Sequence, residues 1–429
     1  MKKTHLTRLV ALAAAGTLTL TACGGDGFDD ETTPADNGAE QDAGGGTDGD
    51  DATGAAGGSS LKMLIASSGD AETNAVQEAV DAWGEESGNT VEVTVASDMN
   101  QELAQGFAGG SPADVFYLNA DAVATNAEAG NLFAYTTEDN DDFYEALRNS
   151  FVVDGEQYCA PKDFSTLALV INTGMWEEAG LTDDDIPTTY DELADVAQQL
   201  TTDDHVGLAF SPEIHRVGAF VVGSGGWWMN DDQTEPTANT PEVIEGLEFV
   251  QSMLQDGSAA YATDLGTGWG GEAFGTEAAA MTIEGNWIKG AMENDYPDVD
   301  YTVVEMPEGS GGPGTLTFTQ CWGIAADSSN QDAAVDLVTF LTSPEQQMKF
   351  ADAFGVMPSR QSAAEDYAST YPEDEAFIAG GEYARGPVNV AGSTEVIADL
   401  NSQLEGLANG NVQSIVESFD NNMQAVLDQ

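Results

Sequence analysis

The feature that most limits the possible folds is a regular alternation of strand and helix patterns from residue 61 to Gly130. Residues 61–66 and 114–118 are apolar runs of strand length, and valines alternate with polar residues over 91–95. A helical pattern with apolar residues on one face follows each strand, and the third ends before Gly130. This order predicts a parallel, right-handed sheet with helices on both faces.

Strand and helix patterns continue to alternate in later segments, and several helix starts carry recognisable N-terminal signals. A capping box starts at Thr189, Pro241 follows Thr240, and Ser343 precedes a proline. The last hundred residues carry two apolar helical stripes. Residues 61–429 are too many for a typical single core, so we expect an α/β protein with two globular units.

The N-terminus has the pattern of a lipoprotein signal peptide over residues 1–22. Basic residues precede an apolar run that is too short to span a bilayer, and Leu-Thr-Ala-Cys follows as a lipobox. We therefore expect a lipid on Cys23 that anchors the protein at the extracellular face of the cytoplasmic membrane. Ordinary cleavage, which would leave Cys23 as a free thiol, is the alternative. Residues 23–60 are acidic and rich in glycine, which predicts a disordered linker.

Acidic residues dominate the charge of the chain. The sequence has 75 Asp and Glu against 11 Lys and Arg, a formal net charge of −64. Such a chain repels nucleic acid, which is excluded as a partner. Acidic side chains also keep a protein hydrated and soluble, so the composition suits an extracellular medium of high salt. No segment beyond the signal peptide is apolar enough to cross a membrane.

Two cysteines, Cys159 and Cys321, remain after Cys23. In an exported protein such a pair predicts a disulfide. Two separately buried thiols that behave as small apolar residues are the alternative.

Four segments together resemble the family 1 extracellular solute-binding proteins, the maltose-binding-protein type. They are QGFAGGSPADV over 105–115, GEQYCAP over 155–161, AMTIEGNW over 280–287 and FLTSPEQQ over 340–347. The resemblance covers 61–429 and implies a two-lobed, type II periplasmic-binding-protein-like fold. Its lobes would be built from discontinuous chain, joined by hinge strands, and would close on a ligand.

In this family arrangement, lobe 1 would span about 61–168 and 316–358, and lobe 2 about 169–315 and 359–429. The implied partners are an oligosaccharide and the permease subunits of an ABC importer. We expect a monomer with no cofactor, no metal and no catalytic residues.

The ligand site is expected beyond the carboxyl ends of the strands, where ligands lie in open α/β sheets. This places the loops 67–70, 119–121 and 284–287 around the ligand. These loops contribute the candidate ligand-binding residues Asp70, Asp121, Glu284 and Trp287.

Aromatic side chains are the strongest indication of a carbohydrate site. Sugars present flat C–H faces and rings of hydroxyls, so they need aromatic planes and planar polar groups. Trp287 is a candidate stacking residue, and so are Trp227 and Trp228, which follow two glycines. Burial in the core is the alternative for each of them.

The resemblance also assigns ligand contacts to Asp121, Glu213 and His215. For the two acids, a solvated surface position is the alternative. Ser165 stands where the maltose binder has a cleft glutamate, so the resemblance does not extend to maltose itself.

Lys162 is a further candidate because bases are scarce and it directly follows the hinge segment. It could donate to a sugar hydroxyl or pair with Asp163, and the sequence leaves both open.

Two other classes of function remain. An extracellular glycoside hydrolase would need two carboxylates across a scissile bond, and the chain has acids enough, although it carries no recognised catalytic motif. A polyamine receptor of the same fold would need acids flanked by aromatic rings. A ferric receptor is less consistent with the sequence, because no adjacent tyrosine pair occurs.

Overall fold

The computed structural model describes residues 58–67 and 69–429. The predicted signal peptide, the predicted lipid on Cys23 and nearly all of the predicted linker lie outside the described residues. The described part falls within one compact unit, Ala55–Gln429. None of its helices is long and apolar enough to cross a membrane.

The first sheet has the strand order β2-β1-β3-β14-β6. These strands are β1 (Ser60–Ile65), β2 (Thr90–Val95), β3 (Val115–Asn119), β6 (Cys159–Pro161) and β14 (Gln320–Ile324). β1 pairs in parallel with β2 and β3, and β14 pairs antiparallel with β3 and β6. The parallel β1, β2 and β3 confirm the arrangement predicted for the start of the chain.

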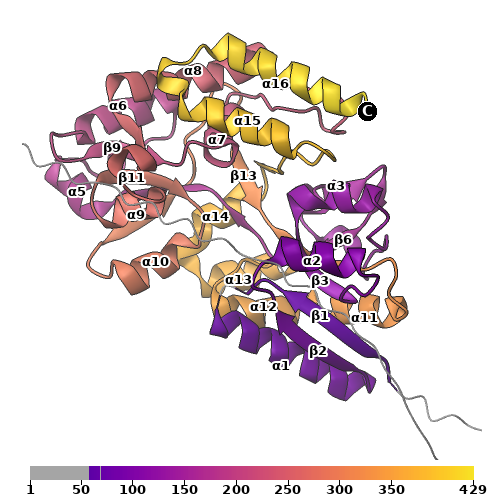
Figure 1. The fold of residues 1–429 in the computed structure, drawn as a ribbon. Helices are drawn as coiled ribbons and strands as arrows, with labels where there is room; N and C mark the ends of the chain where they lie inside the picture. Colours follow the sequence, from indigo (N-terminus) through magenta and orange to yellow (C-terminus); the bar gives the residue numbers. More distant parts are fainter. Residues whose placement is uncertain (1–57, 68) are drawn as a thin grey trace, which may run out of the picture. The chain divides into compact units, whose positions relative to one another are not determined.

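Helices connect and cover this sheet, and Figure 1 shows the first three of them in indigo and violet and the last two in orange. They are α1 (Asp70–Ser87), α2 (Met99–Ala108), α3 (Ala120–Glu128), α11 (Gln331–Leu341) and α12 (Pro344–Phe354). The predicted apolar face of α1 is buried in one core with residues of α11 and α12. A helix with such a face gains most of its stability from this packing.

The second sheet has the order β10-β9-β11-β8-β12. These strands are β8 (Ala168–Asn172), β9 (Val206–Phe210), β10 (Ala259–Tyr261), β11 (Ala279–Glu284) and β12 (Tyr301–Val304). β9 is parallel to β10 and β11, whereas β8 is antiparallel to β11 and β12.

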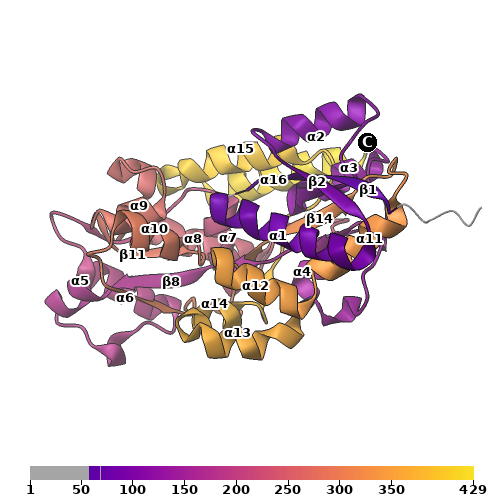
Figure 2. The same ribbon diagram turned by 90° about the horizontal axis from the view of Figure 1, so that it is seen from below.

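The helices around the second sheet include the two at the C-terminus. They are α5 (Thr173–Glu178), α6 (Tyr190–Leu200), α7 (Ile214–Gly223), α8 (Pro241–Asp256), α9 (Gly270–Gly275), α10 (Ile288–Asp295), α15 (Thr394–Glu405) and α16 (Val412–Leu427). Both views show α15 and α16, in yellow, beside α7 and α8 (Figures 1 and 2). The predicted C-terminal stripes supply Leu400, Leu404 and Phe419 to the same core.

Three helix starts agree with the sequence signals. Thr189 and Glu192 form the predicted capping box of α6, Pro241 is in the first turn of α8, and the Ser343 hydroxyl caps α12. The Thr189 and Ser343 side chains accept from backbone N–H groups that the helix start would leave unpaired, and Pro241 has no N–H to leave unpaired.

Short elements join the two five-stranded sheets. A small sheet has the order β15-β13-β7, made of β15 (Ala384–Arg385), β13 (Thr315–Phe318) and β7 (Ser165–Thr166). The chain leaves the first sheet through β6 and β7 and returns to it through β13 and β14.

The remaining elements are short helices and one hairpin. They are α4 (Glu145–Asn149), β4 (Val152–Val153), β5 (Glu156–Gln157), α13 (Ala364–Thr370), α14 (Glu375–Gly380) and the 3-10 helices η1 (Asn140–Asp142), η2 (Asp183–Asp185), η3 (Ala262–Leu265), η4 (Gln361–Ala363), η5 (Pro372–Asp374) and η6 (Leu407–Asn409).

A disulfide joins Cys159 on β6 to Cys321 on β14, as the sequence predicts. The two strands are neighbours in the first sheet, and the two Cα atoms are 5.6 Å apart. The bridge spans 162 positions of the sequence, so it ties the strand that leaves the first sheet to the strand that returns.

Candidate functional site

A cavity of about 770 Å³ lies between residues of the two five-stranded sheets and their helices. The first sheet contributes the loop after β1 and the turn from β3 into α3, and the second contributes the loop after β11. These are the three loops that the sequence predicts around a ligand. Open α/β sheets bind their ligands in the crevice beyond the carboxyl ends of the strands, so a site at this position agrees with the fold.

Aromatic rings form one part of the cavity wall. Trp287 is 37% exposed, and in the described part of the chain the other large hydrophobic residue exposed to this degree is Val95. The ring centre of Trp287 is 5.0 Å from that of Phe318, at an interplanar angle of 74°. Phe164 and Phe354 also line the cavity. An exposed tryptophan beside a second ring gives a sugar a flat apolar surface.

Buried charges hold the Trp287 ring in place. Its Nε1 donates to Oε2 of Glu284 at 3.0 Å, and Nη2 of Arg216 is 2.7 Å from the same oxygen. The Arg216 guanidinium lies 5.4 Å from the centre of the Trp287 ring and 5.2 Å from that of Phe318. Because Arg216 and Glu284 reach the ring from α7 and β11, its position is determined by the second sheet.

Glu284 itself is fully buried and does not line the cavity, contrary to the prediction that it binds ligand. Burial raises the pKa of its carboxyl, although Arg216 acts in the opposite direction. The side chain turns inward because its partners Arg216 and Trp287 lie there. Glu284 therefore positions the wall and does not form it.

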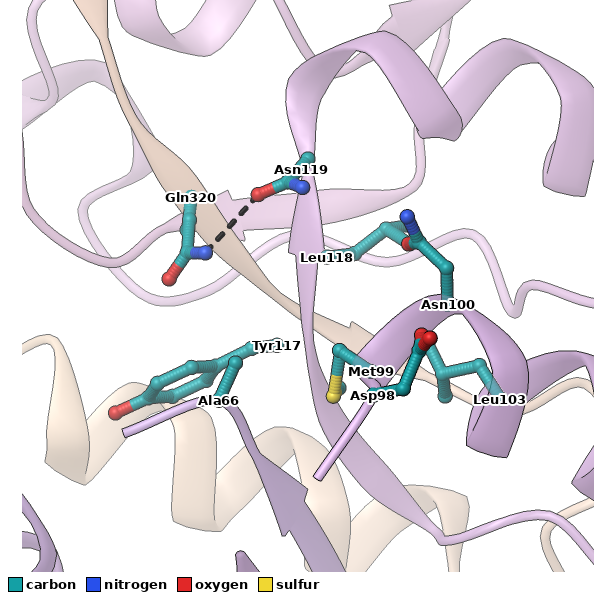
Figure 3. Close-up of a pocket in the computed structure, with 9 residues that line it drawn as sticks. All are labelled: Ala66, Asp98, Met99, Asn100, Leu103, Tyr117, Leu118, Asn119 and Gln320. Carbon is teal, nitrogen blue, oxygen red and sulfur yellow. Dashed lines mark hydrogen bonds between the residues drawn. The ribbon is translucent and has the colours of Figure 1, made fainter. Parts of the chain in front are cut away.

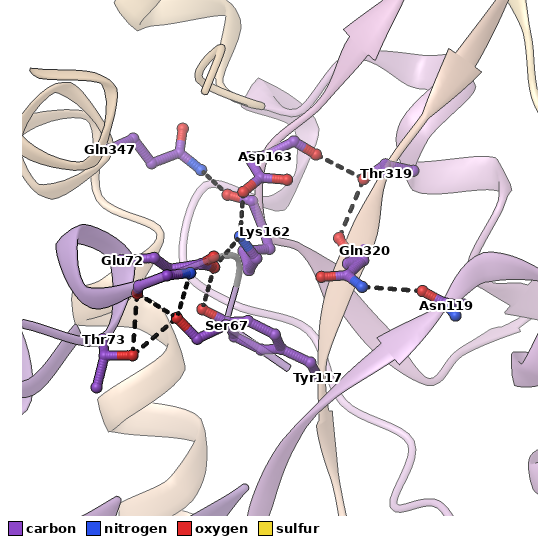
Figure 4. Close-up of polar contacts among 11 residues, drawn as sticks. Ser67, Glu72, Thr73, Tyr117, Asn119, Lys162, Asp163, Thr319, Gln320 and Gln347 are labelled. Atoms are coloured by element: carbon purple, nitrogen blue, oxygen red, sulfur yellow. Dashed lines mark hydrogen bonds and ion pairs between the residues drawn. The ribbon is translucent and has the colours of Figure 1, made fainter. Parts of the chain in front are cut away.

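A second group of charges surrounds Lys162, as Figure 4 shows. The Lys162 ammonium lies 3.1 Å from Oε1 of Glu72 and also pairs with the Asp163 carboxylate. The Tyr117 hydroxyl donates to Glu72 at 3.0 Å. Of the two roles left open for Lys162, the structure therefore contains the pairing with Asp163, and it adds Glu72.

This pairing governs the charge of the group. Burial lowers the pKa of Lys162, but Asp163 and Glu72 outweigh that effect and the net pKa is raised. Burial raises the pKa of Asp163, and Lys162 opposes it. The Lys162 ammonium is thus held in its charged form, with neighbouring carboxylates that balance it.

Backbone contacts fix the same segment at the cavity. Gln347 donates through Nε2 to the Lys162 carbonyl at 3.1 Å, and the Thr319 hydroxyl donates to the Asp163 carbonyl at 2.6 Å. Figure 4 shows both contacts. Residues from α12 and from the connection between β13 and β14 therefore hold Lys162 and Asp163 from opposite sides.

Asp121 and His215 also line the cavity, which is consistent with the ligand contacts predicted for them. Asp121 is exposed in the first turn of α3, and His215 on α7 lies 6.0 Å from Phe318 between ring centres. Burial lowers the pKa of His215, and Glu213 opposes the shift. His215 is therefore more readily neutral than an ordinary histidine.

Two further predicted acids lie outside the cavity lining. Asp70 begins α1. Glu213 precedes the first residue of α7, and its carboxylate lies 3.7 Å from Nη1 of Arg216. Both lie close in sequence to residues that do line it, since Glu72 is two residues after Asp70 and His215 is two residues after Glu213. Of the residues predicted from the three loops, Asp121 and Trp287 line the cavity, whereas Asp70 and Glu284 do not.

Trp227 and Trp228 are in the core and not at the site, which corrects the prediction that they stack on ligand. Their exposed fractions are 5% and 0%. Trp228 packs against Phe419 of α16 with ring centres 5.4 Å apart, and Arg385 lies over the Trp227 ring. Their partners come from distant parts of the chain, which the local Gly-Gly pattern does not reveal.

The sequence interpretation missed several cavity residues, namely Glu72, Asn119, Asp163, Asn286, Phe318 and Gln320. A signal existed for Asn119 and Asn286, because both lie in loops predicted at the site. None existed for Phe318, which follows alternating residues typical of any strand.

Comparisons with known proteins agree with this geometry. A family model described as bacterial extracellular solute-binding protein matches residues 78–379. The diacetylchitobiose binding protein DasA of Streptomyces coelicolor is 24% identical over 302 residues, which cover 68% of this chain and 70% of that protein. The maltotriose-binding protein of Pyrococcus abyssi is 25% identical over 279 residues, which cover 61% of this chain and 58% of that protein.

Solved structures share the fold. The cyclic alpha-maltosyl-1,6-maltose binding protein from Arthrobacter globiformis matches with a TM-score of 0.78 and 22% identity, over 86% of this chain and 99% of that one. The GacH receptor of Streptomyces glaucescens matches with a TM-score of 0.73 and 19% identity, over 87% and 99%. The predicted two-lobed α/β fold is thereby confirmed, and the chain belongs to the bacterial extracellular solute-binding proteins.

Proposed function

We propose that this protein is an extracellular receptor that binds an oligosaccharide in the cavity and delivers it to an ABC importer. The observation that carries the proposal is the exposed Trp287 ring, held edge to face with Phe318 in a cavity that is also lined by polar side chains such as Asn119, Asn286 and Gln320. Stacking on such a ring and hydrogen bonding to planar side chains are what a pyranose requires. Relatives named for diacetylchitobiose and maltotriose support this ligand class.

A polyamine receptor is supported less well by the charges in the cavity. Glu72 and Asp163 face it, but both lie in the ion-paired group around Lys162. A polyamine site would use such carboxylates to hold ammonium groups of the ligand. Here the protein's own ammonium occupies that place.

A screen of the purified protein tests the function. We expect thermal unfolding to shift upward with at least one member of an oligosaccharide panel and not with putrescine or spermidine. Chromatography after incubation should return the bound sugar uncut, which separates a receptor from a glycoside hydrolase. A shift with amines alone, or cleaved sugar, would contradict the proposal.

The lipobox at Cys23 and membership of an extracellular family support attachment to the membrane. We infer that a lipid on this thiol tethers the protein to the outer face of the cytoplasmic membrane. The Cys23→Ser variant should then appear in the culture medium. If it stays in the membrane fraction, the anchor is elsewhere.

A further inference from the structure

A second, smaller pocket of about 100 Å³ opens beside the cavity on the side of the first sheet. The two share Ala66, Met99, Asn119 and Gln320 as lining residues, so a ligand in the cavity can extend into the pocket. The pocket lies where β1 and β3 end and α2 begins.

The pocket is too small for a sugar ring. An engineered cavity of about 150 Å³ is known to hold benzene, a flat six-membered ring without substituents. A pyranose is bulkier than benzene, so a pocket of about 100 Å³ admits only a group of a few atoms that projects from a ring held in the cavity. Its occupant is a substituent.

Part of the pocket wall is apolar. Leu103 on α2 is 5% exposed and Leu118 on β3 is 2% exposed. The Tyr117 hydroxyl is engaged with Glu72, so Tyr117 also offers mainly its ring to the pocket. Burying a bare hydroxyl against such a wall is unfavourable, whereas burying a methyl group there is favourable.

Amide side chains supply the polar part. Gln320 donates through Nε2 to Oδ1 of Asn119 at 2.9 Å, and Figure 3 shows this pair on one side of the pocket, away from Leu103. The bond uses one N–H and one carbonyl oxygen. The Gln320 carbonyl oxygen and the Asn119 amino group remain for a ligand, which provides one acceptor and one donor.

A donor, an acceptor and an apolar wall together match a secondary amide that carries a methyl group. We propose that the small pocket is a subsite for the acetamido group of an N-acetylated sugar. The acetamido N–H would donate to Gln320, its carbonyl would accept from Asn119, and its methyl would contact Leu103 and Leu118. The inference rests on the carbohydrate-binding function proposed above.

The pocket also discriminates by charge. Asp98 lines it, and neither lysine nor arginine is among the residues that do. A sulfate or carboxylate substituent would meet a like charge without a compensating base. An anionic substituent is therefore disfavoured, and a neutral acetamido group is compatible with this lining.

Calorimetry with two matched disaccharides tests the subsite. Diacetylchitobiose and cellobiose share their β-1,4 linkage and differ in the groups at C2, acetamido in one and hydroxyl in the other. We expect the wild-type protein to bind diacetylchitobiose at least about tenfold more tightly. In Gln320→Leu, which removes the acceptor but keeps the side-chain size, the preference should fall below about threefold.

Gln413→Leu is the matched control, because Gln413 is exposed on α16 and lies outside both lining sets. It should keep the wild-type preference, and unfolding of both variants verifies that they fold. If wild type binds saccharides without preferring the acetamido sugar, or if Gln320→Leu keeps the preference, the subsite is wrong while the receptor function stands. If no saccharide of a wider panel binds, both proposals fall.

Discussion

Lys162 illustrates how single residues set the chemistry of the cavity. It is 5% exposed and pairs with Glu72 and Asp163, so three charges are removed from most of the water that would otherwise solvate them. Removing the base from such a group leaves buried carboxylates without their counter-charge, which is strongly destabilising. In a chain with 75 acidic residues, losing the one base here leaves carboxylates with no replacement nearby.

Lys162→Met should therefore destabilise the protein strongly. We expect a loss of about 3–5 kcal/mol in the free energy of unfolding, because two buried carboxylates lose their counter-charge. Lys349→Met is the control, since Lys349 is 59% exposed and, among the described residues, forms an ion pair only with Glu345 on the same helix. It should change stability by less than about 1 kcal/mol. Urea unfolding measures both, and equal effects would show that the Lys162 group is not structural.

The shifted pKa of His215 predicts how the stability of the protein depends on pH. This pKa is lowered in the folded protein, mainly by burial, so the unfolded chain binds the proton more tightly. As pH falls through the ordinary histidine value of about 6.5, the unfolded state gains protons first and stability decreases. The wild-type protein should thus lose more unfolding free energy between pH 7.5 and 5 than His215→Gln does. If the unfolding free energies of the two proteins fall equally with decreasing pH, the lowered pKa of His215 is contradicted.

In the loop between β11 and α10, a glycine determines where a neighbouring side chain can lie. A Cβ on Gly285 would lie 2.2 Å from the Trp287 ring, which is closer than any allowed contact. Gly285 therefore lets the ring fold back over the loop while its Nε1 reaches Glu284. The backbone of this turn and the position of the ring are coupled.

Gly285→Ala should displace the ring and weaken ligand binding at least about fivefold, within the range for losing an aromatic contact. Gly290→Ala is the matched control in the following helix, where a Cβ would meet nothing within 4 Å. That change should leave affinity unaltered and raise stability by about 0.5–1 kcal/mol. Titration calorimetry and urea unfolding of both variants decide, and unchanged affinity in Gly285→Ala would refute the coupling.

Most elements could be predicted from the sequence, because local patterns determine them. The parallel strands β1 to β3, the face of α1 and the caps of α6, α8 and α12 all follow from spacing within about twenty residues. The direction in which a side chain points at an element's end could not. Trp228 is buried by Phe419 and Glu284 is turned inward by Arg216, and both partners are far away in the sequence.

Charge acts on the whole molecule. A formal net charge of −64 means that acidic side chains repel one another across the folded surface, which lowers stability at low ionic strength. We expect the unfolding midpoint to rise by at least about 5 °C between 0.05 M and 1 M KCl, and then to level off as the screening length falls to about 3 Å. A midpoint that is independent of salt, or that rises linearly without levelling, would point to another effect.

The central claim is that ligand stacks on Trp287, and calorimetry of Trp287→Ala tests it most directly. With the sugar that the panel identifies, affinity should fall by about 1–3 kcal/mol, or roughly 5- to 150-fold. The unfolding midpoint without ligand should change little, because the ring is already 37% exposed and fills no part of the core. A folded variant that binds the sugar as tightly as the wild-type protein would contradict the account.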